Sequence, residues 1–319
     1  MENPYISPSR VRAALRSLEL RPTRGMGQNF LTDPDALGAI VAAAELTRAD
    51  TVVEIGPGLG VLTWELLQRA GRVVAVELDR RLVDRLGQEF AGDPRLEIVQ
   101  GDILNLSPEQ LLGARDWGLG ASTNSQAPSP WPLAPGPWPL APGYKVVANL
   151  PYAITSAALR HFLEARRRPE LIVVLVQWEV AERIAARPGD LSVLAHSVQI
   201  YAEPQILVRV PAAGFVPAPA VDSAVLRLRV RPRPAVDVEV DALMRLIKAG
   251  FLQARKQLAN ALPTGLAAMG VKIEKQRAVA ALEAAGVNPS RRAETVTLEE
   301  WVRVYRTLFD QADHESRRP

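Results

Sequence analysis

Short apolar runs that alternate with helical segments constrain the fold of this chain most strongly. Each run is rich in Val, Ile or Leu, and most are followed by residues with helical periodicity. Such alternation indicates a parallel, doubly wound sheet. We therefore expect an α/β, Rossmann-like fold, closed by an antiparallel pair at residues 206–210 and 224–230. The five parallel runs are Thr51–Ile55, Arg72–Glu77, Leu96–Gln100, Lys145–Ala148 and Leu171–Val176.

The pattern changes after the Pro-spaced linker Arg231–Pro234. Beyond it, residues 240–262, 272–285 and 298–309 have helical periodicity and no clear strand. We therefore predict a basic N-terminal segment (1–24), an α/β domain (25–230) and a small all-α domain (231–319).

Residues 113–143 interrupt the α/β domain with a segment rich in Pro, Trp and Gly. It contains the near-tandem repeat Pro130–Gly136 and Pro137–Gly143. This density of Pro and Gly is incompatible with a helix or a central strand, so we expect a surface excursion. Two interpretations stay open, a neutral repeat expansion and a binding segment for an aromatic-lined groove.

Charge and composition exclude several classes of protein. The chain has no Cys and three scattered His, so we expect no disulfide, no thiolate site and no bound metal. It has neither a long apolar span nor a secretory h-region, which favours a cytoplasmic location or an organelle matrix. The net charge is only +3, but basic residues cluster where they can neutralise RNA or DNA phosphates. The clusters are Arg10, Arg12, Arg16, Arg21 and Arg24, and Arg166–Arg168.

A glycine-rich turn, Gly56-Pro57-Gly58-Leu59-Gly60, follows the first apolar strand. Gly56 and Gly58 let the main chain turn sharply and approach a ligand closely. The third glycine comes one residue too early for the dinucleotide fingerprint, whose last position is Val61. This spacing suits S-adenosylmethionine, which has no pyrophosphate, better than NAD. Alone, the motif is weak evidence.

Two acids at strand ends support a cofactor site. Glu77 ends the second strand, where a carboxylate can accept hydrogen bonds from ribose hydroxyls. Asp102 follows the third strand and can accept from an adenine amine. Either acid alone is more simply a solvated strand end or a helix cap. Both in register with the glycine turn favour the cofactor interpretation.

The motif Asn149-Leu150-Pro151-Tyr152 follows the fourth strand and predicts a site for a nucleic-acid base. The lone pair of a base amine is delocalised into the ring, so the nitrogen is a poor nucleophile. Two acceptors, the Asn149 side-chain oxygen and the Leu150 carbonyl, would favour a pyramidal nitrogen. Pro151 fixes the turn and Tyr152 offers a face for stacking. The alternative is an ordinary strand-to-helix turn.

Phe215 is a second aromatic candidate. It lies in the Pro-spaced loop 214–223, before the last strand. Two interpretations are open, a ring that closes over the other face of the base and a plug in the core.

Together these motifs resemble the rRNA adenine N6-dimethyltransferases of the KsgA (RsmA) type, which act on small-subunit rRNA. The resemblance covers about residues 27–308. It rests on Gly27–Leu31, Val53–Gly60, Val76–Asp79, Gly101-Asp102, Asn149–Tyr152, Glu179–Arg183, Phe215–Ser223, Phe251–Leu262 and Arg292–Glu294.

The resemblance implies dimethylation of two adjacent adenines near the 3′ end of 16S rRNA, with S-adenosylmethionine as cofactor and a small-subunit precursor as partner. It implies that Asn149, Leu150 and Tyr152 face the target amine, with Phe215 helping to hold the base. The basic N-terminus and the helical domain would bind RNA, and we expect a monomer. The implied cofactor contacts are Asn29, Leu31, Gly56, Glu77, Asp102 and Asn149, with Gln28 lining the same pocket.

The chain departs from this family at the 113–143 insert, in a short segment after Pro188-Gly189, and at Trp178, which replaces a usual basic residue. Three rival functions remain. They are 23S rRNA adenine methylation of the macrolide-resistance type, a non-catalytic ribosome assembly factor, and an NAD-linked oxidoreductase. The Phe215 loop and the helical domain favour the small-subunit type. The intact Asn149–Tyr152 motif favours catalysis.

Overall fold

The structure is a computed structural model, and it describes residues 3–20, 29–113 and 143–309. The 113–143 insert lies almost entirely outside these residues, as do Gln28, Arg21 and Arg24. The chain divides into two compact units, Met1–Trp178 with Gln205–Val230, and Glu179–Pro204 with Arg231–Pro319. The predicted boundary at residue 230 is also a boundary here. Glu179–Pro204, which the sequence placed in the α/β domain, belongs instead with the helices.

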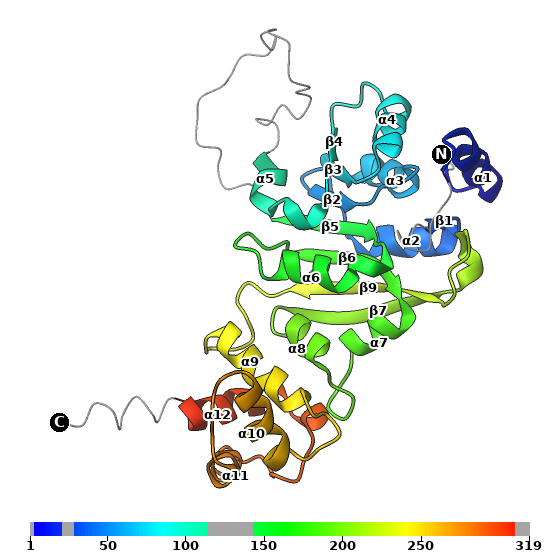
Figure 1. Cartoon of the computed structure of the whole chain (residues 1–319). Coiled ribbons are helices and arrows are strands. Elements are labelled where there is room, and N and C mark those ends of the chain that lie inside the picture. The colour runs from blue at the N-terminus through cyan, green and yellow to red at the C-terminus, as the bar shows by residue number, and fades with distance from the viewer. Residues whose placement is uncertain (1–2, 21–28, 114–142, 310–319) are drawn as a thin grey trace, which may run out of the picture. The chain divides into compact units, whose positions relative to one another are not determined.

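A seven-stranded sheet forms the centre of the α/β fold, in the order β4-β3-β2-β5-β6-β9-β7 (Figure 1). Strands β4, β3, β2, β5 and β6 are parallel, and β9 is antiparallel to β6. The order reverses direction between β2 and β5, where α/β sheets bind ligands beyond the carboxyl ends of their strands. The strands are β2 (Thr51–Ile55), β3 (Arg72–Glu77), β4 (Leu96–Gln100), β5 (Tyr144–Asn149), β6 (Leu171–Gln177), β7 (Ala202–Val210) and β9 (Ser223–Val230).

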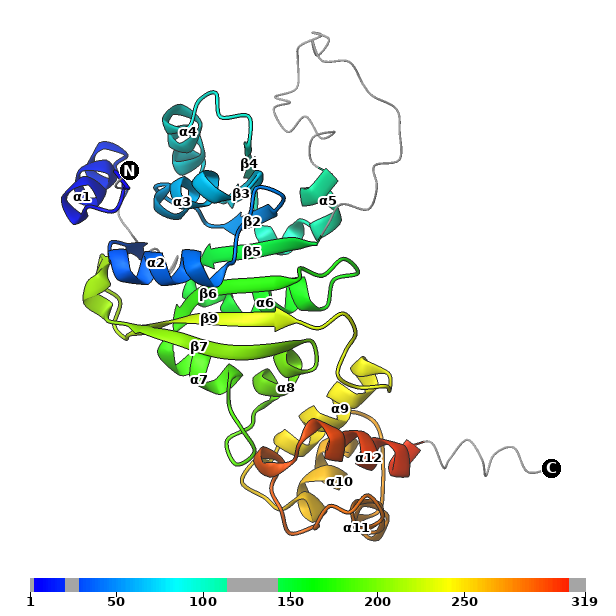
Figure 2. The ribbon, with the colours of Figure 1, turned by 180° about the vertical axis from the view of Figure 1, so that it is seen from behind.

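Helices cover both faces of this sheet. Helix α6 (Thr155–Leu163) lies in front of the sheet in Figure 1, and α2 (Pro34–Ala43) lies in front in the view from behind (Figure 2). Asp33 caps α2 by accepting from the main-chain N–H groups of residues 35 and 36, and Pro34 occupies the first turn. The remaining helices between the parallel strands are α3 (Val61–Arg69), α4 (Arg80–Glu89), the short η1 (Ile103–Asn105), α5 (Pro108–Gly113) and η3 (Tyr152–Ile154).

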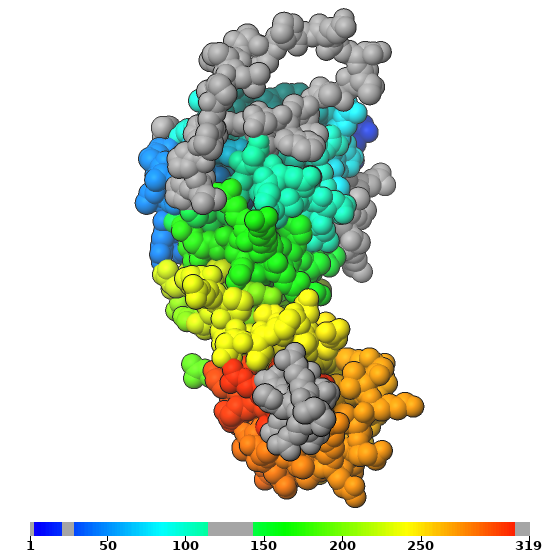
Figure 3. All heavy atoms as spheres, turned by 90° about the vertical axis from the view of Figure 1, so that its left-hand side faces the viewer, coloured from blue at the N-terminus to red at the C-terminus, as the bar shows by residue number. Residues whose placement is uncertain are grey.

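The connection from β4 packs against α6. The imidazole Nε2 of His161 lies 2.9 Å from the Leu106 carbonyl oxygen, and the Arg167 N–H donates to Glu109 at 3.1 Å. The space-filling view shows the cyan and green segments as one continuous surface on this side (Figure 3).

A small two-stranded pair lies apart from the main sheet. Strand β1 (Phe30–Leu31) pairs antiparallel with β8 (Phe215–Val216), which follows the short η4 (Ala212–Gly214). Helix α1 (Pro8–Ser17) buries Val11, Ala14 and Leu15 in a cluster that also holds Phe30 and Leu59. The sequence predicted only a basic segment here, and this helix is new.

The second unit is helical around residues 240–309. Its helices are α9 (Val240–Phe251), α10 (Leu258–Ala268), α11 (Lys275–Ala284), η5 (Ala293–Thr295) and α12 (Leu298–Phe309). Helix α8 (Val193–Gln199) joins them, because His196 packs edge-on against Phe251 and Trp301. The predicted helical stretch 240–262 is two helices rather than one. No helix in the described part of the chain is long and apolar enough to span a membrane.

Candidate active site

A cavity of about 440 Å³ opens beyond the carboxyl ends of β2, β3, β4 and β5. The glycine turn, both predicted acids and the Asn149–Tyr152 motif all line it. Leu78, which follows β3, and Ile103, which follows β4, also line the cavity. Of the residues predicted for the cofactor, the structure brings these to one cavity: Asn29, Leu31, Gly56, Gly58, Glu77, Asp102 and Asn149. Gln28 lies outside the described residues.

The glycine turn has the backbone that the sequence predicted. Gly56, Gly58 and Gly60 all have positive φ, which favours glycine. A Cβ on Gly58 would lie 3.0 Å from the Phe30 ring, and one on Gly60 would lie 2.6 Å from the Phe90 ring. A Cβ on Gly56 would lie 3.7 Å from Pro151 Cδ, so the glycine turn and the Asn149–Tyr152 turn face each other.

Glu77 holds the glycine turn through its carboxylate. Oε2 accepts from the Gly58 N–H at 3.1 Å, and Oε1 accepts from the N–H groups of Leu78 and Asp79 at 2.8 and 3.0 Å. The side chain is only 6% exposed. Burial raises the pKa of Glu77, and the three main-chain donors oppose that shift. A carboxylate has about four acceptor sites, so capacity remains for a ligand hydroxyl.

Asp102 lines the same cavity but also caps a helix. Its Oδ1 accepts from the Leu104 N–H at 3.0 Å at the start of η1. The helix-cap interpretation therefore holds for Asp102, alongside its place in the cavity wall.

Glu54 lies deep in the cavity wall, and the sequence analysis gave it no role. It is 1% exposed, and its Oε2 accepts from the Thr63 hydroxyl at 2.7 Å. Burial raises the pKa of Glu54 to about 8, and the nearby Glu77 charge adds to the shift. The signal in the sequence was an acid inside an apolar strand.

Asn149 is oriented by a distant part of the chain. Its Nδ2 donates to the Asn29 carbonyl at 2.8 Å. With the amide N–H group used in this way, Oδ1 is the atom that can accept from a target amine. The next residue, Leu150, is 2% exposed and donates its N–H to the Leu175 carbonyl at 3.2 Å.

Tyr152 presents a partly exposed ring to the cavity, and its hydroxyl lies 2.6 Å from the Ser223 hydroxyl. Burial raises the pKa of the Tyr152 phenol, so the group is neutral near pH 7. A neutral aromatic face at the cavity edge suits stacking on a flat base.

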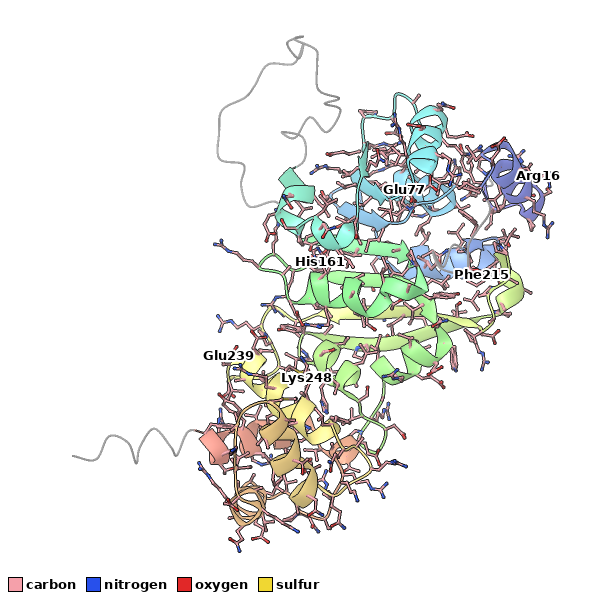
Figure 4. The ribbon with its side chains drawn as sticks, in the orientation of Figure 1. Arg16, Glu77, His161, Phe215, Glu239 and Lys248 are labelled. Carbon is pink, nitrogen blue, oxygen red and sulfur yellow. The ribbon has the colours of Figure 1, made fainter. Side chains whose placement is uncertain are left out.

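Phe215 is not among the residues that line the cavity. It is 3% exposed and packs in the core with Leu31, Leu37 and Val210. Phe215 is the first residue of β8, within the β1–β8 pair, whereas Glu77 ends β3, and Figure 4 labels the two side chains at separate places. Of the two interpretations, this geometry favours the core plug, because contact with a base would require Phe215 to leave the core.

The cavity fits S-adenosylmethionine by its donors and acceptors. A buried carboxylate next to the glycine turn suits the ribose hydroxyls. The exposed Leu78 side chain (63%) and Ile103 offer apolar surface to an adenine ring. Leu78 directly follows Glu77, and this position in the sequence could have indicated that Leu78 lines the cofactor cavity. Among the described residues, no group of three or more His, Cys, Asp or Glu is placed to hold a metal ion.

Comparison with known proteins gives consistent results. The model of the family "Ribosomal RNA adenine dimethylase" matches residues 21–310. A protein of Dehalococcoides mccartyi named "Ribosomal RNA small subunit methyltransferase A" is 42% identical over 300 residues, 92% of each chain. The protein of the same name from Moorella thermoacetica is 42% identical over 305 residues, 95% of this chain and 98% of its own.

Two solved structures have a similar fold. The 23S rRNA methyltransferase ErmE is 29% identical, with a TM-score of 0.61 over 88% of this chain and 99% of its own. A dimethyladenosine transferase from Plasmodium falciparum is 22% identical, with a TM-score of 0.65 over 86% of this chain and 95% of its own. The second supports the fold alone.

Proposed function

This chain belongs to the ribosomal RNA adenine dimethylase family, and from that premise we propose that it dimethylates adenine N6 in small-subunit rRNA with S-adenosylmethionine. The target is two adjacent adenines near the 3′ end of 16S rRNA. The observation that carries the proposal is the shared cavity, where Asn149 and Tyr152 meet the glycine turn and Glu77. Relatives at 42% identity carry the small-subunit name, whereas ErmE, a 23S enzyme, is 29% identical.

We assign the cofactor to the half of the cavity built by β2, β3 and β4. Glu77 accepts from the ribose hydroxyls, and Asp102 accepts from the adenine amine. Leu78 and Ile103 cover the adenine ring. When bound, S-adenosylmethionine supplies a methyl group on a positively charged sulfur.

The target base enters from the side of Asn149 and Tyr152. In the first transfer, the Oδ1 of Asn149 and the Leu150 carbonyl accept hydrogen bonds from the two N–H groups of the adenine amine, which favours a pyramidal nitrogen with its lone pair available. In the second transfer the amine has one N–H group left, and it donates to one of these two acceptors. Tyr152 stacks on the extruded base and fixes its plane. Asn149 cannot act as a base, and none is needed before transfer, because the methylated nitrogen is positively charged and acidic and then releases its proton to water. Positioning and electrostatics therefore carry the catalysis.

RNA binding is assigned to the exposed basic side chains. Arg10, Arg12 and Arg16 lie on α1, whose apolar face is buried, so their charged ends remain outside. Such residues neutralise phosphates without reading sequence. We also propose a pre-30S particle as the substrate, a monomeric enzyme and a cytoplasmic location.

The test is transfer of tritiated methyl groups from S-adenosylmethionine to small-subunit particles that lack the modification. The product nucleosides are separated afterwards. We expect N6,N6-dimethyladenosine near the 3′ end of 16S rRNA. Transfer only to large-subunit rRNA would instead establish the 23S function. Cofactor binding without transfer to either RNA would favour an assembly factor.

A further inference from the structure

The hydroxyl groups of Tyr152 and Ser223 connect two parts of the chain that are 71 residues apart. Their oxygens lie 2.6 Å apart. Ser223 is fully buried, at 0% exposed, and it is not among the cavity-lining residues. Tyr152 does line the cavity and is partly exposed. Ser223 therefore reaches the cavity only through the Tyr152 side chain.

The Tyr152 side chain is held at both ends. Pro151 precedes Tyr152, which is the first residue of the short helix η3. The main chain therefore holds the Cα end, while the hydrogen bond holds the opposite, hydroxyl end. A tyrosine side chain has two torsions that set the plane of its ring. The hydroxyl oxygen lies on the axis of the second torsion, so the hydrogen bond restrains the first torsion and thereby fixes the position and direction of the ring.

Ser223 is itself held firmly. It pairs with Gln177 at the start of β9. The preceding residue, Asp222, accepts from the Trp178 N–H through its carbonyl at 3.0 Å. The Asp222 carboxylate accepts from the Ala212 N–H at 3.0 Å and from Arg209 Nε at 2.9 Å. These bonds tie the Pro-spaced loop to the end of β6, and Ser223 is the rigid anchor for the tyrosine.

We propose that Ser223 is a positioning residue, which orients the Tyr152 ring for stacking on the target base. The inference rests on the proposed function, because that function gives Tyr152 its base. In this role Ser223 also connects the Pro-spaced loop to the site. The loop contributes through the Ser223 hydroxyl, while Phe215 fills the core.

Placement before binding matters because stacking requires the ring to lie at a defined position beside the base. A side chain that is free to change its first torsion loses that freedom when the base arrives, and the loss weakens the productive complex. A misplaced ring also holds the amine away from the methyl group, and small errors in position lower the rate strongly. Loss of the hydrogen bond between Tyr152 and Ser223 should therefore reduce kcat and leave cofactor binding unchanged.

A double-mutant cycle tests this proposal. Ser223→Ala and Tyr152→Phe remove the same hydrogen bond from opposite ends. We expect each to lower kcat roughly tenfold, the ratio that one neutral hydrogen bond can supply. The double variant should be no slower than either single variant, because the bond is lost only once. The dissociation constant of S-adenosylmethionine should stay unchanged in all three.

A fluorescent base gives a readout that a structural role would not change. RNA with 2-aminopurine at the target position reports stacking on Tyr152 by its emission. We expect Ser223→Ala and Tyr152→Phe to change the emission in the same direction. Ser223→Thr keeps the hydroxyl and should restore wild-type emission and turnover. Ser197→Ala is the matched control, because Ser197 is also buried (7%) and its hydroxyl bonds to the Leu194 carbonyl.

Three results would overturn the proposal. One is wild-type turnover and emission in Ser223→Ala. Another is a double variant whose loss is the product of the two single losses. The third is a much larger loss in Tyr152→Phe than in Ser223→Ala, which would place the phenol in direct contact with substrate.

The design keeps the two hypotheses separate. If Ser223→Ala does not fold, Tyr152→Phe removes the same bond from the partly exposed side. If the wild-type enzyme transfers no methyl group to small-subunit RNA, the proposed function fails. In that case the same double-mutant cycle on the free energy of unfolding still tests the Tyr152–Ser223 hydrogen bond, because it needs no RNA.

Discussion

The side-chain amide of Asn149 donates a hydrogen bond of 2.8 Å to the main-chain carbonyl of Asn29. The bond joins the end of β5 to the residue before β1, across 120 positions of sequence. It determines which end of the Asn149 amide can accept from a substrate. The orientation of the residue that faces the target amine therefore depends on a segment near the N-terminus.

Replacing Asn149 should abolish transfer and leave the fold intact. Asn149→Ala removes both the acceptor and the bond to Asn29, so we expect kcat to fall at least about 100-fold. Asn149→Asp keeps an oxygen but places a carboxylate against the Asn29 carbonyl, and it should also be slow. Single-turnover methyl transfer and thermal melting measure the two effects. Asn260→Ala, at an exposed position of α10, is the control. Near-normal turnover in Asn149→Ala would remove the residue from the site.

Glu77→Gln should weaken cofactor binding by about ten- to a hundredfold, a hydrogen-bond loss to a charged group. The Gln amide has one acceptor oxygen, whereas Glu77 already accepts from three main-chain N–H groups. Because its pKa is raised, the wild-type affinity should fall as the pH decreases through that raised value. The variant should lack this dependence. Calorimetric titration measures both, with Glu97→Gln on β4 as the control. An unchanged dissociation constant would contradict the assignment.

Glu54→Gln should stabilise the protein at alkaline pH. The pKa of the Glu54 carboxyl is 4.5 in the unfolded chain, and burial raises it to about 8 in the folded one. Between these values the folded state binds more protons, so the free energy of unfolding falls as the pH rises. Glutamine keeps the contact with Thr63 without a charge, and it should gain a few kcal/mol near pH 9. Urea unfolding at several pH values measures this, with Glu164→Gln at the C-cap of α6 as the control. Parallel pH profiles for Glu54→Gln and wild type would refute the prediction.

His196 should make the helical unit sensitive to acid. The side chain is 0% exposed, and neither ring nitrogen has a hydrogen-bond partner among the described residues. Burial lowers the pKa of His196 to about 4, from an ordinary value of 6.5. As the pH falls through this window only the unfolded state gains the proton, and stability decreases by about 3 kcal/mol in total.

His196→Phe should therefore remove this acid-dependent loss, which unfolding at pH values above and below the window would measure. His161→Gln is the control, and it should keep the loss because His196 is still present. Equal acid sensitivity in His196→Phe and wild type would exclude His196 as the cause.

Gly265→Ala should destabilise the helical unit by several kcal/mol. A Cβ at Gly265 would lie 2.0 Å from the Ala249 carbonyl oxygen, so α9 and α10 must move apart. Gly87→Ala on α4 is the control, since a Cβ there meets nothing within 4 Å. It should be neutral or stabilising by up to about 1 kcal/mol. Thermal melting of the two variants measures the contrast, and similar melting temperatures would show that the helices adjust easily.

The strands were predictable from the sequence because their signals are local. Short runs with apolar centres, each next to a Gly or Asp on at least one side, gave β2, β3 and β4 with their observed ends. Helix boundaries were predicted less accurately where the apolar pattern continues beyond the end of the helix. Leu252 continues the apolar pattern of α9, yet it is 54% exposed in the structure, and the helix ends before it. Helix α10 then continues through Pro263, a residue whose local preference is against a helix interior.

The site was predictable where chemistry follows a strand end. Glu77, Asp102 and Asn149 are such residues, and the sheet topology brings them to one cavity. The bond from Asn149 to Asn29 and the contact of Tyr152 with Ser223 were not predictable, because each joins segments far apart in sequence. For Phe215 the sequence left two roles open, and only the packed structure distinguishes them.

The attachment points of the insert lie far from the chemistry. Strand β5 begins at Tyr144, opposite Thr51 at the amino end of β2, and it ends at Asn149 in the cavity. The strand has six residues, so five steps separate its two ends, about 17 Å at the usual rise per residue. Leu112, next to Gly113, accepts from Arg72 at the start of β3, so that attachment point is also away from the strand ends that line the cavity. Insertions or deletions between Gly113 and Gly143 should therefore disturb catalysis little. For the same reason, this junction is where an engineer would fuse a fluorescent reporter.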